Sequence, residues 1–577
     1  MSRPDSDIST TERAASAGPR ERTWTPRQWA LSTLATFVGG GWIWTPKRLP
    51  LLPHRARSLL LLFAFVVLAG LLRHLSALPE LGERPQLPIR AQEAGPLAES
   101  LASRIAEHPG HSGIRLLVSA EDAFAARMEL AEVATRTLDV QVYIWREDLT
   151  GTLLLEALHQ AADRGVRVRL LLDDNGAQGL DEALAALDAH PRAEVRLFNP
   201  FRFRTHRWFN FVTDFQRLNR RMHNKAFIAD DAVAIVGGRN VGDEYFGPTE
   251  GVLFIDLDAL AVGEVVEDVS HNFERYWQSS GAWPLERLLE VPEADLSAWQ
   301  ERHDVWMARV EQAQREAPVD PGVEQVARTR PPLIDGLLDG TLSLTWAPVR
   351  MLSDHPDKAL GQLADNERML RELIAILAGA RTRVELVSPY FVPGKVGTER
   401  LGELPASGVA LRILTNALEA TDVPAVQAGY AKRRRPLLEA GVRLFELEQS
   451  RPEEARGRSG TWWSGSSSGS SLHAKTFAVD GRSLFVGSFN FDPRSASLNT
   501  EMGLVIEAPE LAVALGALFE GPILDRAYEV QLTEKGDLQW IDREGETVTL
   551  LDEEPNSSAW MRLWIAFLGV LPIEWLL

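Results

Sequence analysis

The sequence predicts an α/β protein made of two equivalent halves, and three observations support this prediction. The pattern H-x-K-x4-D occurs twice, beginning at His223 and at His473. Each copy is followed, after the same number of residues, by a glycine-containing step that ends in asparagine, at Asn240 and at Asn490. Apolar segments typical of strands alternate with amphipathic, helix-like segments around both copies. The repeated spacing indicates an internal duplication, and the alternation predicts a sheet core covered by helices.

The strand and helix signals follow one another in a similar way in both halves. In the first half the predicted strands cover residues 136–145, 166–172, 195–198 and 253–262, and the predicted helices cover 151–164, 179–190 and 265–277. In the second half the predicted helices cover 366–379, 395–406 and 424–440, and the predicted strands cover 383–391, 409–414 and 442–447. Such alternation is typical of α/β layers with the strands inside.

Each motif is predicted to lie on a strand that ends in a tight hairpin turn. Alternate residues of a strand share a face, so the histidine and the lysine of each motif would point the same way. Asp230-Asp231 and Asp480-Gly481 then form the turns, because these residue types tolerate positive φ. The apolar return strands end at glycines, where backbone can approach a ligand closely and each asparagine side chain can donate to it.

Together the two motifs would place two imidazoles, two ammonium groups and two carboxamides around one point. This set suits a tetrahedral phosphodiester: lysines and asparagines would bind its non-bridging oxygens, while one histidine attacks phosphorus and the other protonates the leaving oxygen. The chemistry requires no metal and no cofactor. A lone histidine is more often a packed core residue, but the duplicated spacing favours catalysis. The predicted catalytic residues are His223, Lys225, Asp230, Asn240, His473, Lys475, Asp480 and Asn490.

The motifs and their flanks resemble the phospholipase D superfamily and, within it, the bacterial cardiolipin synthase C group. The segments that carry this resemblance are 138–145, 219–225, 490–495 and 499–503, and the similarity extends from about Ala123 to Leu577. It implies two duplicated phospholipase D-like α/β halves with mixed sheets packed together. It also implies that His223 is the nucleophile that forms a phosphohistidine, and that His473 is the acid that then becomes the base.

Two carboxylates follow the asparagine steps at corresponding places, Asp256 and Glu501. A carboxylate at the second ring nitrogen fixes the tautomer of an imidazole. By resemblance, Asp256 would orient His223 and Glu501 would orient His473, with structural ion pairing as the alternative. The first copy has Gly238 where the family pattern has serine, so we expect a hydroxyl contact to phosphate to be missing there.

The domain boundaries are predicted from composition and motif placement. Residues 1–57 form a basic, partly disordered N-terminal segment and 58–75 a transmembrane anchor; 113–283 form the first catalytic half, 284–345 a connector, 346–525 the second catalytic half, and 526–577 a C-terminal extension with an interfacial hydrophobic tail. The anchor contains fifteen uncharged residues, Ser58 to Leu72, between flanking arginines that would snorkel. A cleaved signal peptide is the alternative.

The overall charge and the basic segment before His223 bear on the substrate. A net charge of −19 argues against nucleic acid, and zero cysteines exclude disulfides and thiol nucleophiles. Residues 201–221 interleave arginines with aromatics, which could stack single-stranded nucleic acid, contact lipid headgroups, or form a solvated loop. The acidic balance and the apolar anchor favour lipid. For Asp173-Asp174-Asn175, a helix-capping or turn role is favoured over a metal site.

These patterns and the resemblance predict a membrane-bound phosphatidyltransferase that makes cardiolipin. The resemblance implies phosphatidylglycerol as acceptor and phosphatidylethanolamine or a second phosphatidylglycerol as donor. The alternatives are a phospholipid hydrolase of the phospholipase D type and, less favoured, a nucleic-acid phosphodiesterase. The excess of basic residues before the anchor predicts a cytoplasmic N-terminus and an extracytoplasmic catalytic body on a bacterial inner membrane. The donor lipid and the need for a helper protein stay open.

Overall fold

A computed structural model describes residues 95–246, 253–289, 332–363, 369–449 and 470–577 without 522 and 546, and isolated residues between 62 and 81 and between 297 and 308. The chain divides into two units, Met1–Leu71 and Leu72–Leu577, and both predicted halves lie in the second unit. The predicted basic segment 1–57 and most of the predicted anchor 58–75 lie outside the described residues. In the part of the chain that the structure describes, no helix combines the length and the apolar character needed to cross a membrane.

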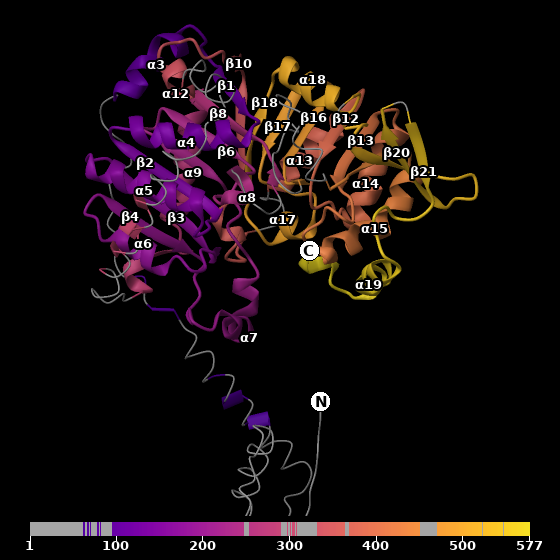
Figure 1. Ribbon diagram of the computed structural model, residues 1–577, viewed down its shortest axis with the longest axis horizontal. Coiled ribbons are helices and arrows are strands. Elements are labelled where there is room, and N and C mark those ends of the chain that lie inside the picture. The colour runs from indigo at the N-terminus through magenta and orange to yellow at the C-terminus, as the bar shows by residue number, and fades with distance from the viewer. Residues whose placement is uncertain are drawn as a thin grey trace, which may run out of the picture. The chain divides into compact units, whose positions relative to one another are not determined.

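Two large sheets form the framework of residues 72–577 (Figure 1). The first sheet contains β1 (Ser112–Leu117), β2 (Thr137–Ile144), β3 (Arg167–Gly176), β4 (Ala193–Phe198), β5 (Ala226–Ala229), β6 (Val233–Gly237), β8 (Asp258–Gly263), β9 (Ala282–Pro284) and β10 (Thr345–Ala347). The second contains β11 (Val349–Ser353), β12 (Arg383–Val387), β13 (Ala410–Asn416), β14 (Arg443–Leu447), β16 (Lys475–Val479), β17 (Ser483–Gly487), β18 (Met502–Ile506), β19 (Ala527–Leu532), β20 (Leu538–Glu544) and β21 (Thr547–Leu551).

The strand order of the two sheets confirms the duplicated α/β halves. The first sheet runs β10-β1-β8-β6-β5-β2-β3-β4-β9 and the second runs β11-β18-β17-β16-β12-β13-β14-β19-β20-β21, so β1-β8-β6-β5-β2-β3-β4 matches β11-β18-β17-β16-β12-β13-β14. Both sheets are mixed, because β2, β3 and β4 are parallel, as are β12, β13 and β14, whereas their other neighbours pair antiparallel. The second sheet continues through β19–β21, beyond residue 525, where the sequence placed the start of an extension.

Helices cover the sheets, as the alternation of strand and helix signals predicts. They are α3 (Pro96–Ala106), α4 (Ala120–Val133), α5 (Leu149–Asp163), α6 (Asp181–Asp188), α7 (Arg207–Leu218), α8 (Asp243–Phe246), α9 (Glu264–Trp277), α12 (Leu333–Leu338), α13 (Met369–Ala378), α14 (Gly394–Ala406), α15 (Pro424–Glu439), α17 (Pro493–Ser497), α18 (Pro509–Leu518) and α19 (Ala559–Val570). One buried cluster belongs to each half, and a further cluster contains side chains of both sheets together with α9 and α18. The halves are therefore joined through a shared apolar core.

The two motif hairpins adopt the turn geometry that their residue types favour. Asp230 and Asp231 have φ of 52° and 53°, and Asp480 and Gly481 have φ of 54° and 59°. Two consecutive residues with positive φ are the mark of the tight turn whose twist matches that of paired strands. The hairpins β5–β6 and β16–β17 thus form where the sequence predicts them.

The strand predicted over residues 253–262 is divided in the structure. Residues 253–255 form β7, Asp258 begins β8, and Asp256 lies between them. β8 stays in the first sheet, whereas β7 leaves it and pairs in parallel with β15 (Ser470–Leu472), which directly precedes His473. This break in the strand carries a segment of the first half to the second motif.

Candidate active site

The motif histidines lie just ahead of β5 and β16, in segments held by the opposite half. His223 donates its backbone N–H to the carbonyl of Thr500 at 3.0 Å, and His473 donates its own to the carbonyl of Ile255 at 2.8 Å. Both imidazoles are almost fully buried, with relative exposures of 7% and 6%. The strands begin later than predicted because the chain from each histidine to its lysine bonds across the two halves rather than within one sheet.

Each imidazole is held by a carboxylate from the other half. His223 Nδ1 lies 2.8 Å from Glu501 Oε2, and His473 Nδ1 lies 2.5 Å from Asp256 Oδ2. The pairing predicted from the sequence, with Asp256 on His223 and Glu501 on His473, is therefore wrong. The partners are exchanged because β7 pairs with β15 and Met222 bridges to Thr500, so each carboxylate emerges beside the motif of the opposite half.

The motif lysines lie within electrostatic reach of both imidazoles. Lys225 Nζ donates to the carbonyl of His223 at 2.6 Å, and Lys475 Nζ donates to the carbonyl of His473. Burial lowers the pKa of His223 well below its usual value, and the charges of Lys225 and Lys475 lower it further. Burial and the same two lysines lower the pKa of His473 to about 4 against the opposing charge of Asp256. The two motifs thus share one electrostatic environment.

Both motif lysines are buried, with relative exposures of 2% and 1%. Burial lowers the pKa of Lys225 well below its usual value, and the charge of Lys475 adds to this effect. Burial lowers the pKa of Lys475 to about 8, although Asp256 and Glu501 oppose the shift. A bound anion between the lysines would favour their protonated forms. The site is therefore electrostatically suited to a phosphodiester.

The motif asparagines differ in how their side chains are used. Asn240 Oδ1 accepts from the Ile144 N–H at 3.2 Å, and its Nδ2 lies 2.9 Å from the Tyr245 hydroxyl. Asn490 is 4% exposed, and its Oδ1 has no hydrogen-bond partner among the described residues. The Asn490 side chain thus makes fewer hydrogen bonds to the described residues than the Asn240 side chain does.

The comparisons with known proteins settle the family. Residues 128–277 and 373–522 each match the family model described as cardiolipin synthase, PLD-like domain. The chain belongs to the cardiolipin synthase, PLD-like family. Cardiolipin synthase C of Escherichia coli (strain K12) is 46% identical over 485 residues, covering 83% of this chain and 99% of that protein. Cardiolipin synthase of Geobacillus thermodenitrificans (strain NG80-2) is 28% identical over 406 residues, covering 70% of this chain and 64% of that protein.

A solved structure supports the same fold. The crystal structure of phosphatidylserine synthase from Haemophilus influenzae Rd KW20 aligns with a TM-score of 0.50 and 15% identity, covering 83% of this chain and 100% of that chain. Membership of the cardiolipin synthase, PLD-like family identifies the chain as a phosphatidyltransferase-type enzyme. The resemblance seen in the sequence is therefore confirmed.

The two halves of this PLD-like protein hold their carboxylates in different ways. Ser488 Oγ donates to Glu501 Oε2 at 2.5 Å, on the same oxygen that faces His223. A Cβ added to Gly238 would lie 2.1 Å from Asp256 Oδ1. Glycine is thus required where the shorter aspartate approaches the backbone. In this structure the serine hydroxyl contacts a carboxylate, so the substitution of glycine for serine does not simply remove a phosphate contact.

The carboxylates also differ in their affinity for protons. Burial raises the pKa of Glu501 to about 7, even though Lys225 and the hydroxyls of Ser488 and Ser495 favour its ionised form. Burial would likewise raise the pKa of Asp256, but the contacts with His473 and the charge of Lys475 outweigh it and hold that pKa below its usual range. The duplicated site is therefore electrostatically asymmetric, with the more basic carboxylate on His223.

The sequence did not point to the residues that hold Glu501. Ser495 Oγ donates to Glu501 Oε1 at 2.8 Å, and the Glu501 N–H donates to Asp354 Oδ2 at 3.1 Å. Asp354 is in turn paired with the buried Lys358 at 2.6 Å. Ser495 ends the segment 490–495 that carries the family resemblance, but the repeat gives no signal for it, because Tyr245 stands at the corresponding place in the first half. Asp354 directly follows β11 and Lys358 lies in the turn after it, and no motif marks either residue.

The motif aspartates cap backbone at the far end of their strands instead of facing the imidazoles. Asp230 accepts from the N–H groups of Thr135, Arg136 and Thr137 at 3.0, 2.8 and 2.9 Å. Asp480 accepts in the same way from residues 381–383. Burial would raise the pKa of Asp480, but these backbone donors lower it below its usual value. We therefore propose that both aspartates fix the hairpin to the preceding strand and take no part in the chemistry.

Replacing Asp230 by alanine should cost stability far more than activity. The change leaves one buried N–H group, two partly buried N–H groups and the Thr135 hydroxyl without their acceptor, so we expect the free energy of unfolding to fall by about 3 kcal/mol. Asp480→Ala should cost only about 1–2 kcal/mol because its donors are more exposed. Denaturant unfolding measures both values. If folded Asp230→Ala enzyme lost more than tenfold in kcat at unchanged stability, Asp230 would have a catalytic role after all.

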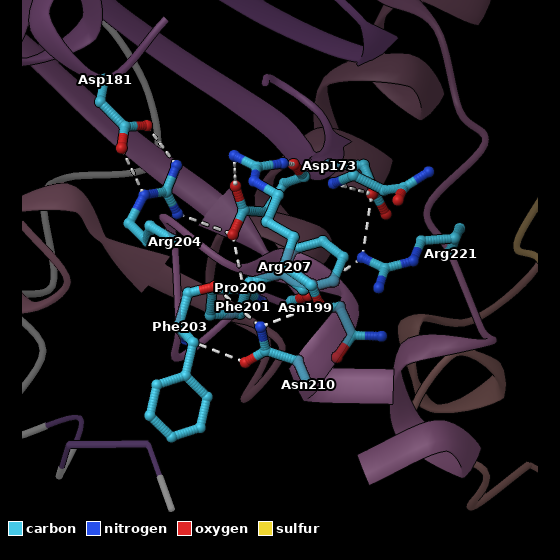
Figure 2. A network of polar contacts seen from close by, with 12 residues as sticks. Asp173, Asp181, Asn199, Pro200, Phe201, Phe203, Arg204, Arg207, Asn210 and Arg221 are labelled. Carbon is cyan, nitrogen blue, oxygen red and sulfur yellow. Dashed lines mark hydrogen bonds and ion pairs between the residues drawn. The ribbon is translucent and has the colours of Figure 1, made fainter. Parts of the chain in front are cut away.

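Asp173 and Asp174 hold the segment that leads into the first motif (Figure 2). Asp173 accepts from the Met222 N–H at 2.8 Å and pairs with Arg221, and Asp174 accepts from the Phe201 N–H at 2.7 Å and from Arg204 at 2.8 Å. These contacts place His223 indirectly, through the residue before it. The structure therefore assigns the aspartates to anchoring arginines and backbone.

The basic and aromatic segment 201–221 pairs most of its arginines and exposes several apolar side chains. Four of its six arginines, Arg204, Arg207, Arg217 and Arg221, are paired with acidic side chains. The exposed face of α7 is instead apolar: Trp208, Phe211, Val212 and Phe215 are 66%, 36%, 67% and 42% exposed. A surface rich in exposed large apolar side chains is typical of an interaction site and not of a cationic groove for nucleic acid.

Proposed function

We propose that this chain is a membrane-bound phosphatidyltransferase that makes cardiolipin by transferring a phosphatidyl group to phosphatidylglycerol. The observation that carries the proposal is the pair of buried imidazoles, each held at Nδ1 by a carboxylate of the other half, beside two buried lysines. The relatives named cardiolipin synthase support the choice of lipid. The donor is phosphatidylethanolamine or a second phosphatidylglycerol.

In the first step His223 acts as the nucleophile. Glu501 holds the Nδ1–H, which leaves the Nε2 lone pair free to attack phosphorus. The P–N bond forms as the bond from phosphorus to the headgroup oxygen breaks. His473 gives its proton to that oxygen, and glycerol or ethanolamine leaves. The product is a phosphatidyl group covalently attached to His223.

In the second step the roles of His473 reverse. Neutral His473 accepts the proton of a phosphatidylglycerol hydroxyl, whose oxygen attacks phosphorus as the bond to His223 breaks. Lys225 and Lys475 balance the charge on the non-bridging oxygens throughout. The low pKa of His473 belongs to the site without an anion, because burial and the lysines cause it. A bound phosphodiester offsets the lysine charges and allows His473 to carry the proton that the first step consumes.

Exposed apolar side chains support work at a membrane surface. On α19, Trp560, Leu563 and Val570 are 75%, 59% and 84% exposed. Figure 1 shows α7 and α19 both at the lower side of residues 72–577. Tryptophan and apolar residues on exposed helices are suited to the interface between headgroups and acyl chains. We place the enzyme at the bacterial inner membrane, with the catalytic body outside the cytoplasm as the charge before residue 58 favours.

Expression in a bacterial host that lacks cardiolipin tests the function. We expect the wild-type chain to restore cardiolipin, measured by lipid mass spectrometry, and the His223→Ala chain to restore none. Purified enzyme given phosphatidylglycerol alone, or with phosphatidylethanolamine labelled in its acyl chains, then identifies the donor from the label in cardiolipin. Release of phosphatidic acid without cardiolipin in both assays would establish the hydrolase alternative instead.

A further inference from the structure

An apolar groove opens in the second half, next in the chain to the motif residue Asn490. Its walls are α13 and α14 and its floor is the segment that follows β17, and its volume is about 970 Å³. The side chains that line it include Ile374 and Leu377 from α13, Val396 and Leu401 from α14, and Phe489 and Phe491 from the floor. Ile374 and Val396, at 48% and 70% exposed, open the groove to solvent. A pocket of this size and character suits a long apolar ligand.

The floor of the groove is next in the chain to a motif asparagine. Phe489 and Phe491 line the groove and flank Asn490, whose side-chain N–H groups are the donors that a phosphate needs. Consecutive Cα atoms are about 3.8 Å apart, so the backbone of Asn490 adjoins the groove floor. In a phospholipid the glycerol and its acyl chains are attached directly to that phosphate. Its chains must leave the site through an apolar exit of this kind.

The first half provides an internal comparison because its corresponding space is filled. There, α8 packs against α4 and α5, which correspond to α13 and α14. Phe246 of α8 is 3% exposed and its ring lies 5.4 Å from that of Phe124 on α4. Phe246 follows Asn240 at the position where Ala496 follows Asn490. The small side chain of Ala496 lines the groove and leaves open the space that a phenyl ring occupies in the first half.

An apolar surface adjoins the groove at α17. Arg494 of α17 donates to the carbonyl of Leu576 at 3.1 and 2.9 Å, which holds residues 574–577 against this helix. Trp575 in this segment is 58% exposed. The groove therefore lies next to an exposed apolar segment at α17, from which an acyl chain would enter when a lipid comes from a bilayer.

We propose that the groove between α13 and α14 binds an acyl chain of the phospholipid whose phosphate reacts at His223. The proposal rests on the proposed function for the identity of the substrate. It makes the two halves unequal: both contribute to phosphate chemistry, and the second half also recognises the lipid tail. Preference for long-chain over short-chain lipids then depends on this groove.

Filling the groove tests the proposal by kinetics. Ala496→Phe places in the second half the side chain that Phe246 supplies in the first. We expect kcat/KM for dioleoyl phosphatidylglycerol to fall at least about tenfold, the equivalent of roughly two buried methylenes. For soluble dihexanoyl phosphatidylglycerol, kcat/KM should stay within about twofold because its short chains leave most of the groove empty. Ile374→Glu places a charge at the mouth of the groove and leaves the packed interior of the protein unchanged. It should also lower kcat/KM for the long-chain lipid and not for the short-chain lipid.

Matched substitutions on α18 serve as controls. Ala514 is exposed there, and Val513 has the same 48% exposure as Ile374. Ala514→Phe and Val513→Glu should leave both substrates unaffected. Equal losses on the long-chain and short-chain lipids in Ala496→Phe and Ile374→Glu, or no loss on either, would overturn the proposal.

Photolabelling separates the groove from the reaction. A phosphatidylglycerol with a diazirine in its acyl chain, in vesicles with the His223→Ala enzyme, should label peptides carrying Ile374 or Val396, and Ala496→Phe should remove most of that label. If the label appears only on other peptides, the acyl chain does not bind in the groove and the proposal is overturned. This holds both for a groove that is empty and for one that another segment of the chain fills. If the groove is labelled but the wild-type enzyme makes no cardiolipin, the acyl-chain site stands and the proposed function is rejected.

Discussion

With a soluble nitrophenyl phosphodiester, His473→Ala enzyme should release one nitrophenolate per active site and then stop, whereas His223→Ala enzyme should release none. Nitrophenolate leaves as a stable anion, so the first displacement needs the nucleophile but not the acid. The second displacement needs a base to activate the acceptor, and His473→Ala lacks it. With natural phospholipid, whose leaving alkoxide must be protonated, both variants should lose on the order of 10⁴-fold in kcat.

Stopped-flow absorbance measures the burst, and mass spectrometry of the His473→Ala protein should find the phosphoryl group on the peptide containing His223. The Asp480→Ala variant serves as a control for local damage near the second motif, because its hairpin is altered while the imidazoles are untouched; it should turn over continuously. A burst from His223→Ala with none from His473→Ala would exchange the roles of the two histidines.

Exchanging a carboxylate for its amide should impair the histidine of the opposite half. Asp256→Asn should lower kcat on natural phospholipid by about 10²- to 10⁴-fold, because the amide no longer fixes the tautomer of His473 or stabilises its protonated form. The nitrophenolate burst should persist in Asp256→Asn, since His223 keeps Glu501 at 2.8 Å. Glu501→Gln should slow the burst itself by about 10²-fold. If the carboxylates acted within their own halves, these two results would be reversed.

The pH dependence of the burst distinguishes positioning from structural damage. Burial raises the pKa of Glu501 to about 7. Below that pH the protonated carboxyl can donate to Nδ1 of His223 and leave Nε2 protonated, which blocks attack. The burst rate of the wild type should therefore rise as pH increases through about 7 and level off above it, and Glu501→Gln should show no such rise. Thermal denaturation at each pH checks that the fold is retained.

The repeat explains how much of this architecture the sequence could predict. The strand order β1-β8-β6-β5-β2-β3-β4 recurs as β11-β18-β17-β16-β12-β13-β14, and the hairpin turns carry the residue types that positive φ requires. Periodicity reports which faces are buried, and turn chemistry reports where strands reverse. The extent of the second sheet was not predicted because β19–β21 come from a segment without a recognised pattern. The groove was not predicted either, because the sequences of its walls, α13 and α14, predict ordinary helices and give no sign of a space between them.

By itself the sequence determined that the chain holds two copies of the H-x-K-x4-D motif, each followed at the same distance by an asparagine, since residue types and their spacing are local properties. Only the tertiary structure decided which carboxylate serves which histidine. Asp256 reaches His473, and Glu501 reaches His223, because β7 leaves its own sheet to pair with β15 and Met222 bridges to Thr500. Hydrogen bonds between backbone segments far apart in the chain set that exchange, and no local pattern encodes a contact between halves.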